Sequence, residues 1–148
     1  MSEAETEALV RQAYEAFNDR QFERTFQIAH PDIVTVVVPT GQALHGHAGV
    51  IEFLSGWSTA FPDSTVEITS IIASDSGAAV EFIGRGTHDG PLATPMGPIP
   101  PTGRPVEFRL CDVWQVRDGK LARTHTYFDV MTILAQIGVE IGVPAHSS

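Results

Sequence analysis

The stretch PTGRPVEFRLCDVWQVRDGK, residues 101–120, decides the fold and points to a site. From residue 106 to residue 116 it alternates with a period of two, which is typical of a β-strand with one buried face. The Asp118-Gly119 pair that follows is hairpin-turn chemistry and predicts a return strand. The more apolar face of this predicted strand also carries a carboxylate: Val106, Phe108, Leu110, Asp112, Trp114 and Val116.

An aspartate on the buried side of a strand has two explanations. Desolvation penalises its charged form and raises its pKa, which makes Asp112 a candidate general acid or base. Alternatively, backbone donors, an arginine or the end of the sheet satisfy the carboxylate, and its role is structural. Both explanations stay open. The opposite face carries Cys111 and Val113 among its polar residues, so the pattern alone does not fix which face is buried.

The composition limits the class of protein. A chain of 148 residues is expected to form one domain, with a core over about 5–138 and a flexible tail over 139–148. The net charge of −9 argues against a nucleic-acid or anionic-membrane surface. The single cysteine, Cys111, excludes an intrachain disulfide. An acidic start and the lack of a long apolar run predict a cytoplasmic protein with no membrane span.

The order of elements predicts an α+β fold, because helices come first and a run of strands follows. Apolar side chains at helical spacing predict a helix over 2–18, a short helix that includes Phe22 and Phe26, and a third helix that follows the turn His45–Gly49 and ends at Pro62. Asp129 is placed to cap a last helix that stops at Gly138. Strands are predicted at 33–38, 66–73, 78–87, 106–116 and 121–128, and His30-Pro31-Asp32 is expected to be a corner.

The segment from His88 to Pro105 contains six prolines and is far longer than a hairpin connection requires. Its glycines provide hinge points, and its few apolar residues could cover an apolar surface such as a ligand-binding opening. We expect it to fold over the ligand-binding opening or onto a partner subunit and to exclude water. A passive surface loop is the alternative.

Taken together, short motifs in a fixed order resemble the SnoaL-like polyketide cyclase family, within the nuclear transport factor two-like superfamily. The resemblance covers about residues 5–138. It rests on Ala16-Phe17-Asn18, His30-Pro31-Asp32, His45-Gly46-His47-Ala48-Gly49, Ala60-Phe61-Pro62-Asp63, Gly86-Thr87-His88-Asp89-Gly90, Pro101-Thr102-Gly103-Arg104, Asp118-Gly119-Lys120-Leu121, and Asp129 with Leu134-Ala135-Gln136-Ile137-Gly138.

The resemblance implies a cone: a curved antiparallel sheet wrapped around three or four helices, with a mouth for a hydrophobic ligand and frequently a homodimer. Such cyclases close a ring by an intramolecular aldol step without a metal, using an aspartate on the last strand and a histidine on the preceding strand. Counted from the Asp-Gly-Lys turn, the histidine position falls on Asp112 and the aspartate position on Thr126. Both positions depart from the family pattern, although Asp112 could supply the acid/base from the neighbouring strand.

The remaining candidate residues each have a structural alternative. Asp129 is either a pocket acid or a helix cap, and His125 has the strand parity opposite to Thr126, which places it outside or at a dimer contact. His88 is either a proton relay at the mouth or a surface residue of the loop. His45 and His47 lack a third ligand at metal-binding spacing, so no metal is expected. Aromatic residues expected to form the wall of a pocket are Phe53, Trp57, Phe82, Phe108 and Trp114.

These observations favour a cofactor-free enzyme of the cyclase, isomerase or dehydratase type that acts on a small, mostly apolar carbonyl compound. Asp112 is its expected acid/base, with Thr126 and His125 orienting the substrate. The alternative is a non-catalytic ligand-binding or dimerisation module of the same fold. A third possibility, epoxide hydrolysis, requires an Asp-Arg-Asp set, and Arg109 and Arg123 have the wrong strand parity for it.

Overall fold

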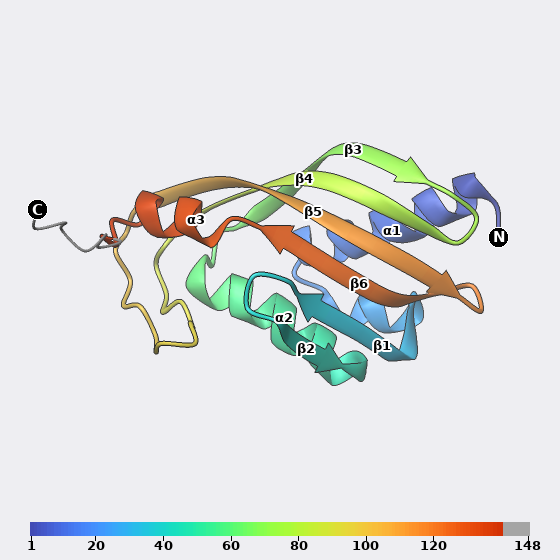
Figure 1. Ribbon diagram of the computed structural model, residues 1–148, viewed down its shortest axis with the longest axis horizontal. Helices are drawn as coiled ribbons and strands as arrows, with labels where there is room; N and C mark the ends of the chain where they lie inside the picture. Colours follow the sequence, from blue (N-terminus) through green and yellow to red (C-terminus); the bar gives the residue numbers. More distant parts are fainter. Residues whose placement is uncertain (141–148) are drawn as a thin grey trace, which may run out of the picture.

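The computed structural model describes residues 1–140 (Figure 1). Its elements, in chain order, are α1 (Glu3–Asn18), the 3₁₀ helix η1 (Phe22–Gln27), β1 (Ala29–Val37), β2 (Gln42–His45), α2 (Gly46–Ala60), β3 (Thr65–Ala73), β4 (Gly77–Thr87), β5 (Pro105–Arg117), β6 (Lys120–Phe128) and α3 (Val130–Gln136). None of the helices in this part of the chain has the length and apolar character of a membrane span.

Six strands form one curved, unclosed sheet in the order β2-β1-β6-β5-β4-β3. Figure 1 shows the long strands β4, β5 and β6 side by side, with α2 beside β1 and β2. The predicted α+β class is confirmed. One pairing differs from the expectation of an antiparallel sheet, because β1 lies parallel to β6. The β1 strand comes from early in the chain, and α2 together with the β3–β4–β5 meander lies between it and β6 in sequence.

Helix α1 starts as its sequence requires. The Ser2 hydroxyl accepts from the Glu5 N–H at 3.1 Å, and the Glu5 carboxylate accepts in return from the Ser2 N–H, which completes a capping box. The buried stripe of the helix includes Leu9, Val10 and Tyr14, and the helix packs on β3. The helix ends at Asn18. The side-chain amide of Asn18 forms hydrogen bonds with the N–H and the carbonyl group of Val66, which fixes the helix end to β3.

The alternation predicted for 106–116 is confirmed in β5. Val106, Phe108 and Leu110 are buried on the inner face, while Glu107, Arg109 and Val113 are exposed on the outer face. The hairpin to β6 turns through Asp118 and Gly119, both of which have positive φ angles. This turn sets the register in which Asp112 lies directly opposite Thr126.

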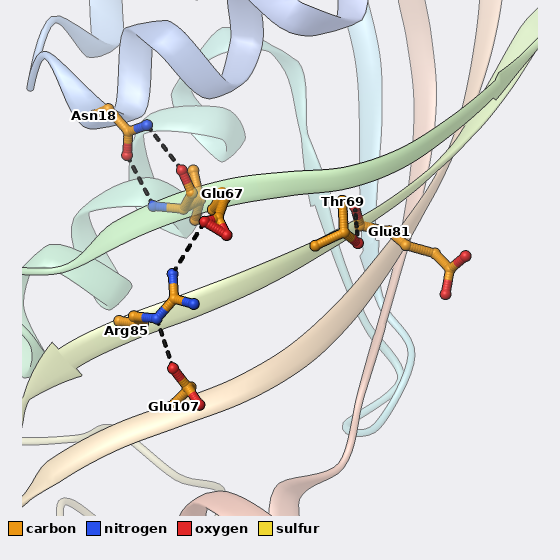
Figure 2. A network of polar contacts seen from close by, with 7 residues as sticks. Asn18, Glu67, Thr69, Glu81, Arg85 and Glu107 are labelled. Atoms are coloured by element: carbon orange, nitrogen blue, oxygen red, sulfur yellow. Dashed lines mark hydrogen bonds and ion pairs between the residues drawn. The ribbon is translucent and has the colours of Figure 1, made fainter.

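On the outer face, three charged side chains cross the strands β3, β4 and β5 (Figure 2). Arg85 lies between Glu107, whose carboxylate accepts from the Arg85 Nε at 2.6 Å, and Glu67, which lies 3.5 Å from the Arg85 Nη1. The Gln136 side chain bonds both backbone groups of Glu107, and this holds α3 against β5. Exposed pairs of this kind contribute little to stability, so their main effect is on strand register.

One strand was not predicted, and one local expectation was wrong. The segment before α2 contains the short edge strand β2, which the turn-rich sequence did not indicate. The expected corner at His30-Pro31-Asp32 lies within β1, at a shift in the pairing register between Ala29 and Val34. Proline has no N–H to donate to a ladder, so it occupies the irregular part of the strand. Most of the expected tail, residues 141–148, lies outside the described residues.

Candidate functional site

A cavity of about 110 Å³ lies between the helices α1 and α2 and the inner face of the sheet. Most of its wall is apolar or aromatic. The five aromatic residues expected in the wall all line this cavity: Phe53, Trp57, Phe82, Phe108 and Trp114. They come from three elements, α2, β4 and β5, so the wall exists only when the sheet curves around the helices. Trp57 makes edge or tilted contacts with several of its neighbours, which fixes its ring in place.

Asp112 lines this cavity and is buried, with 6% of its surface exposed. Burial raises the pKa of Asp112 from its ordinary value of 3.8 to about 6, while Tyr14 and Thr126 act in the opposite direction. One carboxylate oxygen, Oδ2, accepts a hydrogen bond of 2.6 Å from the Tyr14 hydroxyl. The other, Oδ1, has no hydrogen-bond partner of good geometry among the described residues, although the Thr126 hydroxyl lies close enough to the carboxyl group to lower its pKa.

Tyr14 connects Asp112 to the indole of Trp114. The Trp114 Nε1 donates to the Tyr14 oxygen at 3.0 Å, and the Tyr14 hydroxyl donates its own proton to Asp112. Burial, followed by the charge of Asp112, raises the pKa of Tyr14 well above its ordinary value of 10. Tyr14 therefore stays protonated and acts as a fixed donor, which leaves Asp112 as the group that titrates near neutral pH.

Three threonines add polarity to the sheet side of the cavity. Thr35, Thr124 and Thr126 are all buried and line it. Thr126 lies opposite Asp112, and Thr124 lies opposite Trp114 and beside Thr35. The Thr124 hydroxyl oxygen is buried with no hydrogen-bond partner among residues 1–140. The cavity thus has a polar strip along β5, β6 and β1 and a mostly apolar wall elsewhere.

Two of the predicted catalytic residues do not reach the cavity. Asp129 caps α3: its carboxylate accepts from the Met131 N–H at 2.9 Å and from the Thr132 hydroxyl at 2.8 Å, and these contacts lower its pKa. His125 lies on the outer face, opposite Val113, and its ring stacks on Tyr127. Cap geometry and strand parity, respectively, decide these placements.

His88 fits neither of its two expected roles, because it is fully buried and is absent from the cavity wall. Its Nδ1 lies 2.9 Å from the Thr102 hydroxyl, and its ring packs against Phe61. The backbone of His88 also bonds Arg104 and Gly103, so this residue closes the base of the proline-rich segment. No residue of that segment up to Arg104 lines the cavity in the described structure.

Sequence reasoning missed Tyr14 and Thr124. Tyr14 looked like part of the apolar stripe of the first helix, but its hydroxyl was a usable signal, since a buried tyrosine requires a polar partner. Thr124 shares the strand parity of Thr126, and that parity places both inside. Arg109 and Arg123 lie on strand positions that face away from the cavity, as their parity predicted, so the described residues provide no Asp-Arg-Asp set.

The comparisons with known proteins agree with the fold. The family model of the SnoaL-like polyketide cyclases matches residues 8–137. No curated protein matches the sequence.

Among solved structures, IdmH of Streptomyces antibioticus, provisionally designated a polyketide cyclase, is 31% identical, with a TM-score of 0.74 over 90% of this chain and 99% of that one. AclR of Streptomyces galilaeus, provisionally designated a hydroxylase, is 26% identical, with a TM-score of 0.77 over 97% and 91%. A SnoaL-like protein from Jannaschia sp. CCS1 shares the fold at 17% identity, with a TM-score of 0.82 over 94% and 95%. The chain belongs to the SnoaL-like polyketide cyclase family.

Proposed function

We propose that this protein is a cofactor-free enzyme of the cyclase or isomerase type, and that Asp112 moves a proton at a carbon next to a carbonyl group of a small, mostly apolar substrate. The observation that carries the proposal is a buried carboxylate on an apolar cavity, with one oxygen held by Tyr14 and the other unoccupied. A general base needs an oxygen that the substrate can reach and a pKa close to the working pH.

The two carboxylate oxygens of Asp112 have different roles in this mechanism. Tyr14 holds Oδ2 and fixes the plane of the carboxylate, and Oδ1 takes the proton from carbon and later returns it to carbon or oxygen. With a pKa of about 6, Asp112 is mostly ionised at pH 7, yet it is a stronger base than an exposed aspartate. An aldol ring closure and a double-bond shift both begin with this proton transfer.

The departure from the family pattern favours a non-catalytic module by itself, but it can be reconciled with the enzyme assignment. By the resemblance, the position that carries the aspartate in the family falls on Thr126, and Asp112 lies directly across from it on the neighbouring strand. A carboxylate on β5 therefore faces the same part of the cavity as one on β6 would. Exchanging the strand preserves the chemistry while changing the angle of approach to the substrate.

The test measures exchange at carbon without requiring the natural substrate. Deuterium incorporation from D₂O into the activated methylene of 2-tetralone, followed by NMR, reports proton abstraction next to a carbonyl group. We expect exchange above background with the wild-type protein, a rising limb near pH 6, and a fall of at least about 100-fold in Asp112→Asn. Wild-type exchange equal to that of Asp112→Asn would contradict acid/base catalysis and favour a non-catalytic ligand-binding module.

We also propose that the protein is a cytoplasmic homodimer that uses the outer face of the sheet. Support comes from a row of side chains that crosses the sheet, in which strand pairing aligns Ile72, Ala79, Val113, His125 and Val36. Ile72 and Val113 are 73% and 37% exposed. Exposed apolar rows of this kind mark contact surfaces.

A further inference from the structure

The cavity contains a second polar group whose hydrogen-bonding capacity is unused. The Thr124 hydroxyl is buried on a residue that is 4% exposed, and it has no partner among the described residues. Buried polar groups are nearly always hydrogen-bonded, so an unpaired one in a cavity points to a ligand group that completes it. Only two side chains of the described cavity wall hold such buried, unpaired atoms: Asp112 and Thr124.

Strand register fixes how these two groups lie relative to each other. Asp112 pairs with Thr126, and Thr124 is two residues before Thr126 on the same face of β6. Asp112 and Thr124 are therefore diagonal neighbours, which lie about 7–8 Å apart in a sheet of ordinary geometry, with their Cβ atoms somewhat closer. A single small molecule can contact both groups at once.

The two groups demand different chemistry from that molecule. The Oδ1 atom of an ionised carboxylate only accepts, so it requires a donor such as a hydroxyl group or an acidic C–H. The Thr124 hydroxyl has a free proton and can donate to a carbonyl oxygen. Trp57, Phe82 and Phe108 around them require the rest of the ligand to be apolar.

We propose that Thr124 is a specificity-determining residue, whose hydroxyl binds a carbonyl oxygen of the substrate while Asp112 Oδ1 accepts from a second function of the same molecule. The ligand class is an apolar ring compound that carries a carbonyl group and, about one strand diagonal away, a donor to Oδ1, which is a hydroxyl group in a bound ligand or the acidic C–H in a substrate that reacts. This inference rests on the proposed function only for the chemistry that follows binding, because two-point binding does not require turnover.

The experiment compares three matched probes by isothermal titration calorimetry. 3′-Hydroxyacetophenone carries both functions, 3-ethylphenol lacks the carbonyl group, and acetophenone lacks the hydroxyl group. In the wild-type protein we expect 3′-hydroxyacetophenone to bind about tenfold more tightly than 3-ethylphenol, as expected for one good buried hydrogen bond. Thr124→Val removes the hydroxyl with little change in shape and is expected to reduce this ratio to less than about twofold.

Two further variants separate the role of the hydroxyl from a change in packing. Thr124→Ser keeps the hydroxyl and is expected to restore the preference for the ketone. Thr6→Val is the matched control, since Thr6 is buried outside the cavity wall and its hydroxyl donates to the Ser2 carbonyl at 3.1 Å. Thr6→Val should leave the ratio unchanged.

The stability of the ligand-free variants provides a readout that a structural role for Thr124 would not give. Replacing an unpaired buried hydroxyl by a methyl group removes a desolvation penalty, so we expect Thr124→Val to raise the Tm by about 2–4 °C. Thr6→Val breaks a hydrogen bond and should lower the Tm. A lower Tm in Thr124→Val would show that its hydroxyl has a protein partner and would overturn the inference.

The binding outcomes distinguish this inference from the proposed function. A ratio that persists in Thr124→Val, or failure of all three probes to bind, overturns the two-point site. If Thr124→Val abolishes the preference for 3′-hydroxyacetophenone over 3-ethylphenol but the wild-type protein shows no deuterium exchange, the two-point site is supported and the enzyme assignment is rejected. Exchange that depends on Asp112, with no effect of Thr124→Val on binding, leaves the enzyme assignment in place and removes the role of Thr124.

Discussion

The Tyr14 hydroxyl donates a 2.6 Å hydrogen bond to Asp112 Oδ2, and this bond joins the first helix to the fifth strand inside the cavity. It favours the ionised form of a carboxylate that burial otherwise makes neutral. The pKa of about 6 is the balance of these two effects.

Removing the tyrosine hydroxyl should change the pH dependence of the site. In Tyr14→Phe the ionised carboxylate loses its donor, so the pKa of Asp112 should rise above 6 by about one to two units. The acidic limb of deuterium exchange should move to higher pH by the same amount. Tyr127→Phe, on the exposed outer face, is the control and should leave the limb near pH 6. An unmoved limb in Tyr14→Phe would show that the hydrogen bond does not tune Asp112.

Asp112 should make the folded protein less stable as the pH rises. Below pH 3.8 it is protonated in both states, and between 3.8 and about 6 the folded state binds its proton more tightly, so stability is lost over this range. Above pH 6 the loss is complete, at about 3 kcal/mol. Asp112→Asn has no charge to bury. The unfolding free energy of this variant, relative to that of the wild type, should therefore increase by about this amount between pH 4 and pH 7.

Urea denaturation at several pH values measures the difference. Asp75→Asn, in the exposed turn between β3 and β4, is the matched control and should follow the wild-type curve. Parallel curves for the wild type and Asp112→Asn would mean that the carboxylate is not desolvated.

Shortening the proline-rich segment should not impair the cavity. Leu92 and Ile99 bond each other through their backbones and pack on the core, while Met96 at the tip is 98% exposed. Replacing Thr94–Pro100 by a short Gly-Ser link should therefore lower the Tm by a few degrees through loss of Ile99. The affinity for 3-ethylphenol should stay within about twofold, since the segment contributes nothing to the cavity wall. A large loss of affinity would restore the expectation that this segment acts as a lid.

A charge at the centre of the row of side chains that crosses the outer face of the sheet should prevent dimer formation. Val113 lies in the middle of the row, and Val113→Asp should convert a dimer into a monomer, because burying an unpaired carboxylate in an apolar contact is costly. Light scattering at tens of micromolar protein measures the mass. Met96→Asp, an equally drastic change on the exposed loop tip, should remain dimeric. A monomeric wild-type protein would reject the proposed interface.

Local sequence patterns predicted much of the fold and part of the candidate site. The alternation in 106–116 and the Asp-Gly turn placed Asp112 and Thr126 on the inner face, because side chains alternate strictly along a strand and the turn fixes the pairing register. The same rule placed His125 outside. Asp129 was correctly anticipated as a possible cap, because capping depends only on residues within one turn of the helix.

Other features depended on contacts between distant segments, which no local pattern encodes. Strand β2 and the parallel pairing of β1 with β6 exist because neighbouring strands supply their partners, while their own sequences are turn-rich or ambiguous. His88 is buried because the end of α2 and Thr102 converge on it. The sequence by itself determined that one carboxylate shares a strand face with apolar side chains. Only the tertiary structure decided that Tyr14 would occupy one of its oxygens and that Thr124 would be left unpaired beside it, because both depend on how α1 and the curved sheet meet.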